Sequence, residues 1–236
     1  MADGEAFEQY LDNPIWHALT NQQAPLALGD GLARRYPRDV APFGAVVANN
    51  EEALASLAAL EKPGGVVALF LLQPAVAINT WKLLRTAMVA QMVYTGPIAG
   101  PSEPAEASSA ITPLSLADVP AMLELVELTH PGPFLPRTID LGRYRAIWQD
   151  GRLAAMVGER FHLPGYREIS AVCTHPAFQR HGYARQLMLA LMDEIQRDGD
   201  APMLHVFSDN QGAITLYETL GFRRRATVTL SVLERA

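Results

Sequence analysis

The sequence predicts a mixed α/β protein with a smaller first part and a larger second part, and three features lead to this prediction. Segments with the apolar pattern of strands alternate with segments of helical periodicity along the second half. Within it, residues 183–199 have the apolar spacing of a helix with one buried face. Proline and small residues at 96–110 separate the two halves. We therefore expect a sheet flanked by helices, preceded by a small α/β lobe.

The composition fits a folded protein and excludes several function classes. The chain has 236 residues, 49% of them hydrophobic, and a net charge of −6. Broad nucleic-acid binding needs a basic face, so we expect none. Because Cys173 is the single cysteine, no disulfide can form within the chain and a cysteine-based zinc site lacks ligands. A reducing cytoplasm fits this, and we expect no metal.

Neither a secretory signal nor a membrane span is expected. Residues 1–10 carry three acidic groups where a secretory signal would be basic. The most apolar run, residues 64–72, is about a third to a half as long as a bilayer span requires.

The first half is predicted to form a small unit of alternating strands and helices, and it has no motif that indicates a catalytic or binding function. We expect a strand at 43–48, a helix at 50–60 and a buried strand at 65–72, whereas the apolar pattern at 81–94 fits either type. The predicted organisation is an N-terminal lobe at 1–96, a linker at 97–110 and a second domain at 111–236.

The second half has clearer signals for turns and helix ends. The dipeptide Asp150-Gly151 favours a hairpin, and Gly199 and Gly221 favour helix ends. The expected strands lie at 111 onward, 144–149, 152–160, 168–174, 203–207, 222–225 and 227–233, and the expected helices at 116–129, 183–199 and 211–220.

A short segment between a strand and a helix is the clearest indication of chemistry. Gln179-x-x-Gly182-x-Ala184 stands directly before the periodic helix. A small-residue turn that opens a helix directs unpaired N–H groups and the positive end of the helix dipole at one point, which favours a phosphate. Arg180 and Arg185 add positive charge. A tight turn without a ligand is the alternative.

With a second motif downstream, the sequence resembles the GNAT superfamily of acetyl-CoA-dependent N-acetyltransferases. That motif is Asn210 followed by Leu-Tyr-Glu-x-Leu-Gly-Phe at 216–222. The resemblance covers about 111–233 and implies a mixed, mostly antiparallel, twisted sheet. It is strongest to the glycine-N-acyltransferase-like branch, which residues 11–17 and 35–37 also resemble. In that branch the first lobe can be a degenerate copy of the catalytic domain.

The resemblance also implies residues that hold acetyl-CoA. Main-chain groups of Val172 and Thr174 would pair with the pantetheine arm, in the strand that includes Cys173. Asn210 would lie near the sulfur. The pyrophosphate would be held by the turn and the first helical residues, which are Gln179, Arg180, His181, Gly182, Tyr183, Ala184 and Arg185.

Acetyl transfer to an amine needs a proton donor for the leaving thiolate and an acceptor for the amine proton. Tyr217 matches the family's donor, although a helical tyrosine is often a core residue. Glu168 fits a base that acts through water, and the alternative is an ion pair with Arg167 or contact with solvent. His175 and His205 are weaker candidates for the base.

Three further features have both a functional and a structural interpretation. Cys173 could form an acyl-enzyme, but strand alternation places its side chain away from Val172 and Thr174. The basic run 223–225 could bind the adenosine phosphate or an acidic substrate, or face water. The aromatic residues expected at the acceptor mouth, or in the core, are Phe134, Tyr144, Trp148 and Tyr166.

We therefore expect an N-acyltransferase that works by direct attack in a ternary complex, with a small-molecule or peptide amine as acceptor. A non-catalytic acyl-CoA sensor and a protein N-acetyltransferase are the alternatives. A homodimer is compatible with the sequence, and no nucleic-acid or membrane partner is expected.

Overall fold

The computed structural model describes residues 7–96 and 111–236, and most of their strands belong to one large sheet. The strands of this sheet are β3 (Val66–Leu71), β4 (Trp81–Tyr94), β5 (Ile111–Pro113), β6 (Tyr144–Gln149), β7 (Arg152–Leu163), β8 (Tyr166–Thr174), β9 (Ala201–Phe207) and β10 (Phe222–Arg235). Their order in space is β3-β10-β4-β9-β8-β7-β6-β5. Neighbouring strands are antiparallel except β8 and β9, which are parallel. The expected mixed, mostly antiparallel sheet is confirmed.

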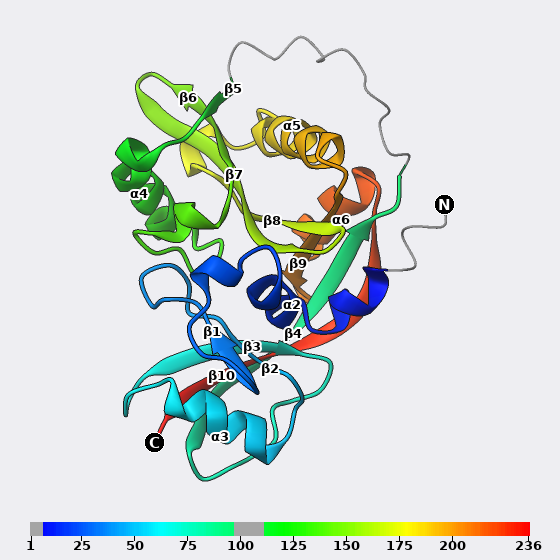
Figure 1. The fold of residues 1–236 in the computed structure, drawn as a ribbon. Helices are drawn as coiled ribbons and strands as arrows, with labels where there is room; N and C mark the ends of the chain where they lie inside the picture. Colours follow the sequence, from blue (N-terminus) through cyan, green and yellow to red (C-terminus); the bar gives the residue numbers. More distant parts are fainter. Residues whose placement is uncertain (1–6, 97–110) are drawn as a thin grey trace.

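Helices cover both faces of this sheet, as Figure 1 shows. Helix α5 (Tyr183–Arg197) packs on one face, against Ile147, Val157 and Ile169. Helix α4 (Val119–Thr129) packs on the other face, near Ala146 and Met156. Because side chains alternate along a strand, β6 and β7 supply residues to both layers. Helix α6 (Gln211–Thr219) belongs to the α5 layer.

The first half of the chain contributes a strand to the middle of the sheet. β4 lies between β9 and β10 and pairs with both, Val89 with Phe207 and Val93 with Met203 on the β9 side. The apolar pattern at 81–94, which fitted either type of element, therefore belongs to a strand. Figure 1 shows β4 and β10 running between the region of α6 and the region of α3 (Glu51–Ala59).

One hydrophobic core joins the two halves. A single cluster includes Ile15 and Phe70 from the first half with Phe161 and Met203 from the second. The predicted division into a lobe at 1–96 and a domain at 111–236 stays a prediction about folding units, and the predicted linker at 97–110 lies outside the described residues. The first half also has the helix α2 (Pro14–Thr20) and a small sheet of β1 (Ala33–Arg35) and β2 (Gly44–Val46).

Three predicted elements, two strands and a helix, need correction. The closing strands expected at 222–225 and 227–233 are one strand, β10, because both parts pair with β4. The register shifts between Arg224 and Ala226, so Arg225 is an extra residue accommodated as a β-bulge. The helix expected at 116–129 starts as a 3-10 turn. The short 3-10 elements are η1 (Glu8–Asp12), η2 (Ala24–Leu26), η3 (Leu116–Asp118), η4 (Thr138–Leu141) and η5 (Pro176–Phe178).

Candidate active site

Strands β8 and β9 diverge in the middle of the sheet. Their described pairing covers Tyr166, Arg167 and Glu168 on β8 and ends there. Farther along, β8 shifts register against β7, and Ala171 in this irregularity has a φ of +51°. A bulge bends its strand. The main chain of Val172 and Thr174 therefore lies where β8 has no partner on its β9 side among the described residues, and it is free to pair with an extended ligand.

The turn before α5 directs backbone donors at one point. Arg180 and Gly182 have φ values of +65° and +77°, which fold the chain tightly ahead of the helix. The N–H of Gln179 donates to the Pro176 carbonyl, 3.5 Å away. Within the described part of the chain, the N–H groups of residues 180–185 have no acceptor. Unpaired donors at the start of a 15-residue helix are suited to binding an anion.

The side chains around this turn are compatible with an anion. Arg180 and Arg185 are exposed, and neither forms an ion pair with a described residue. The ring of His181 stacks on Tyr183, with centroids 5.5 Å apart, and its Nδ1 lies 2.9 Å from the Gln179 carbonyl. This contact stabilises the turn. The donor set of free amides and two guanidinium groups thus fits the pyrophosphate of a nucleotide carrier.

Tyr217 lies on α6, almost buried, with its ring against Phe222 at 6.2 Å between centroids. Burial raises the pKa of its phenol to about 12, so the group keeps its proton at neutral pH. No described residue bonds its hydroxyl. Asn210, at the start of the same helix, accepts a hydrogen bond from the Ala213 N–H through its side-chain oxygen. Its amide NH₂ stays available to a ligand.

Glu168 is fully buried and held by two partners. Arg160 donates to both carboxylate oxygens, at 2.7 and 2.6 Å, and the Arg160 guanidinium also lies over the rings of Phe43, Phe70 and Phe161. Burial acts to raise the pKa of Glu168, but Arg160 and His205 together lower it to about 2. A carboxylate with so low a pKa is a weak base. Its environment favours the ion-pair reading, although with Arg160 in place of Arg167.

His205 belongs to a hydrogen-bonded chain that sequence reasoning did not find. Its Nδ1 lies 2.7 Å from Glu168 Oε1, and its Nε2 lies 3.1 Å from the side-chain nitrogen of Gln91. Gln91 accepts from Arg225 through its oxygen and donates to the Leu11 carbonyl. Because the Gln91 nitrogen can only donate, His205 Nε2 accepts and its proton lies on Nδ1.

Cys173 and His175, two other candidates for chemistry, have contacts that stabilise the fold. Cys173 packs in the layer of α4 whereas Val172 packs in the layer of α5, so their side chains alternate as expected. Burial raises the pKa of the Cys173 thiol to about 12, which leaves little thiolate. His175 accepts the Ala177 N–H at 3.1 Å through Nδ1 and so caps the turn η5.

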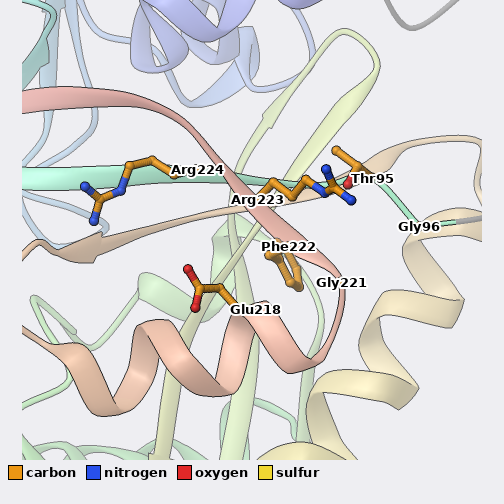
Figure 2. A pocket seen from close by; sticks show the side chains of 7 residues that line it. All are labelled: Thr95, Gly96, Glu218, Gly221, Phe222, Arg223 and Arg224. Atoms are coloured by element: carbon orange, nitrogen blue, oxygen red, sulfur yellow. The ribbon is translucent and has the colours of Figure 1, made fainter.

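The basic run 223–225 lies away from the turn before α5. A cavity of about 410 Å³ is lined by Arg223 and Arg224, next to Thr95 at the end of β4 (Figure 2). β4 is antiparallel to β9, so this end of the sheet holds the starts of β8 and β9, whereas the turn before α5 follows the end of β8. The hypothesis that residues 223–225 bind the adenosine phosphate therefore has no support. Arg225 instead bonds Asp12 at 2.7 Å.

The four aromatic residues expected at an acceptor mouth separate into two groups. Phe134, Tyr144 and Tyr166 are buried core residues. Trp148 is half-buried and lines a cavity of about 450 Å³ beside α4.

Searches for metal sites and membrane spans cover the same described ranges. No group of three or more His, Cys, Asp or Glu side chains there could hold a metal ion. No helix in the described part is both long and apolar enough to cross a membrane.

Comparisons with known proteins agree with this geometry. The family model described as FR47-like protein matches residues 146–231. The [ribosomal protein bS18]-alanine N-acetyltransferase of Escherichia coli K12 is 31% identical over 118 residues, which are 48% of this chain and 79% of that enzyme. The crystal structure of a GNAT-family acetyltransferase, named as putative, from Novosphingobium aromaticivorans is 34% identical and superposes with a TM-score of 0.86, covering 96% of this chain and 98% of that one.

A more distant structure shows the same fold. A GNAT-family acetyltransferase from Colwellia psychrerythraea is 13% identical, with a TM-score of 0.53 and coverage of 99% of this chain and 98% of that one. Together, the fold, the site and the relatives define an acyltransferase enzyme. The chain belongs to the GNAT family of acetyltransferases, which use acetyl-CoA as co-substrate.

Proposed function

We propose that this enzyme transfers the acetyl group of acetyl-CoA to an amine by direct attack, with both substrates bound at once. The observation that supports this most strongly is the set of free N–H groups at 180–185 beside two unpaired arginines. Acetyl-CoA supplies the acetyl group as an activated thioester. In the proposal, the turn holds the pyrophosphate and the free main chain of Val172 and Thr174 pairs with the pantetheine arm.

Tyr217 is the proposed proton donor to the departing thiolate. Its phenol is protonated and has no partner among the described residues, so it is available to donate. Asn210, with its free side-chain NH₂, would bind on the same side of the pantetheine. Cys173 takes no covalent part in this proposal, because a thiol with a pKa near 12 is a poor nucleophile at neutral pH.

The base predicted from the sequence, Glu168, receives a different role here. Since Arg160 occupies both of its oxygens and holds its pKa at about 2, we propose that Glu168 positions His205 and the start of β8. The amine proton then leaves through water. An α-amine, with an ordinary pKa of about 8, is partly neutral at pH 7 and needs only a weak base.

The nature of the acceptor divides the proposal into two cases, a small amine or a peptide amine. One relative acts, by its name, on an alanine of ribosomal protein bS18, which favours a peptide N-terminus. Assignment to the glycine-N-acyltransferase-like branch depends on the sequence resemblance, including that of residues 11–17 and 35–37, and stays a prediction. The same holds for the degenerate first lobe, the homodimer and the cytoplasmic location.

Release of free CoA thiol from acetyl-CoA tests the function. The full chain is assayed with a panel of small amines and with peptides that have free N-termini, first separately and then in competition. Amine-dependent thiol release supports the acetyltransferase, and the preferred acceptor distinguishes the two cases. Tight CoA binding with no release on any acceptor would instead support the acyl-CoA sensor.

A further inference from the structure

The cavity beside α4 has the dimensions of a small-molecule site. This open cavity has a volume of about 450 Å³, within the range of pockets that hold small organic ligands. Its walls come from α4, from the β6–β7 hairpin, and from His175, which directly follows β8. Trp148 and Leu153 from the hairpin and Leu128 from α4 give it apolar surface.

This cavity is separate from the proposed carrier site. The carrier would lie where β8 diverges from β9, whereas the cavity lies toward β7 and β6, on the opposite side of β8. The cavity also belongs to the layer of α4, and the anion-binding turn opens α5 in the other layer. Its occupant therefore does not replace the carrier.

Two opposite charges line the cavity without partners of their own. Glu124 comes from α4 and Arg152 is the first residue of β7, and both are exposed. Neither forms an ion pair or a side-chain hydrogen bond with a described residue. The planar guanidinium group of arginine can form two parallel hydrogen bonds with a carboxylate, and a carboxylate side chain can form an ion pair with an ammonium group.

We infer that this cavity binds a small zwitterion of the amino-acid class. The ligand's carboxylate pairs with Arg152, its ammonium with Glu124, and its apolar side chain packs on Trp148. A neighbouring carboxylate favours the charged form of an amine. Because the cavity lies in the layer of α4, whereas Tyr217 lies in the layer of α5, this ligand is an effector and not the acetyl acceptor.

His175 connects the cavity to the anion-binding turn. It lines the cavity, its Nδ1 accepts the Ala177 N–H, and its carbonyl accepts the Phe178 N–H at 2.9 Å. These bonds form η5, which leads directly into residues 179–182. A ligand that contacts His175 thus changes the position of the free amides, and CoA and the zwitterion alter each other's affinity by the same factor. This coupling, unlike the binding itself, rests on the proposed function.

Titration calorimetry on the full chain tests the binding. A panel of apolar and aromatic L-amino acids is screened, and the best ligand is compared with its amide, which lacks the carboxylate, and with its N-acetyl form, which lacks the ammonium. We expect each altered probe to bind about 10-fold more weakly. Arg152→Gln should remove the preference over the amide, and Glu124→Gln the preference over the N-acetyl form.

Glu127→Gln is the matched control, because Glu127 is exposed on the same helix and does not line the cavity. It should leave all affinities unchanged. No binding by any amino acid in the panel, or unchanged preferences in both cavity variants, overturns the site. A CoA affinity that is the same with and without saturating amino acid overturns the coupling. Because the first titrations contain no CoA, their result stands even if the proposed function fails.

Discussion

The side-chain amide of Gln91 donates to Nε2 of His205 across 3.1 Å, so a residue of the first half fixes the tautomer of a histidine in the second. Gln91 can reach His205 because β4 pairs with β9, where the two residues are directly opposite. The first half is thus part of the sheet that forms the candidate active site.

Residues 111–236 should therefore not fold alone. Without β4, β9 and β10 lose the strand between them, and the core under α5 loses apolar residues such as Ala90 and Met92. We expect this fragment to lack a cooperative thermal transition, which calorimetry or near-UV circular dichroism measures. Co-expression with residues 1–110 is the control and should restore the transition. A fragment that unfolds cooperatively by itself would support an independent domain.

The Glu168–Arg160 pair should make the free energy of unfolding depend on pH in the acidic range. The pKa of Glu168 is lowered from 4.5 to about 2, so the charged form is stabilised in the folded state. The contribution, on the order of 3 kcal/mol, is complete above the unfolded pKa and is lost as the pH falls from about 4.5 to 2. Denaturant unfolding at a series of pH values checks this.

Glu168→Gln is the variant for that experiment. It should lower the free energy of unfolding at pH 7 by about 3–5 kcal/mol, because Arg160 keeps a buried charge without its partner. Its stability should also fall less steeply in acid than that of the unchanged protein. Glu127→Gln, on an exposed surface, should behave like the unchanged protein. A parallel decline of both variants with pH would show that Glu168 does not have the low pKa.

Tyr217→Phe should lower kcat by about 100-fold while CoA affinity stays nearly the same. The phenyl ring keeps the packing against Phe222, and only the proton donor is lost. Steady-state thiol release gives kcat, and calorimetry gives the affinity for CoA. If kcat is unchanged, Tyr217 is a core residue and another group protonates the thiolate.

Cys173→Ala should keep its activity. The thiol has a raised pKa of about 12 and packs in the layer of α4, so its loss removes apolar contacts and no reactive group. The expected cost is about 1 kcal/mol of stability. Activity and thermal unfolding of the variant check both statements. Complete loss of turnover in a folded variant would restore the acyl-enzyme reading.

The parts of the fold that were predictable from the sequence have local causes. The helix α5 follows from its apolar periodicity and ends before Gly199, which has a φ of +88°. The hairpin follows from Asp150-Gly151, whose residues both have positive φ. The joining of 222–225 and 227–233 into one strand depends on β4, which pairs with both parts, so the local pattern cannot show it.

In the candidate site, too, only the features with local causes were predictable from the sequence. The set of free N–H groups in the turn before α5 was predictable because all of these donors lie within a few consecutive residues. The partner of Glu168 was not predictable, because Arg160 meets it across the β7–β8 hairpin within a register shift. Arg167, the neighbour of Glu168 in sequence, bonds Asp198 and Asp200 instead. Nothing local to Gln91 or Arg225 indicates the chain of hydrogen bonds that ends at His205.

Backbone amide NMR of the full chain with added CoA tests most directly whether the turn before α5 holds the carrier. The account predicts that the N–H resonances of residues 180–185 show the largest downfield shifts, because each passes from water to a phosphate oxygen. The N–H resonances near Arg223 and Arg224, at the opposite end of the sheet, should stay in place. CoA binding that leaves the amides of 180–185 unshifted would contradict it.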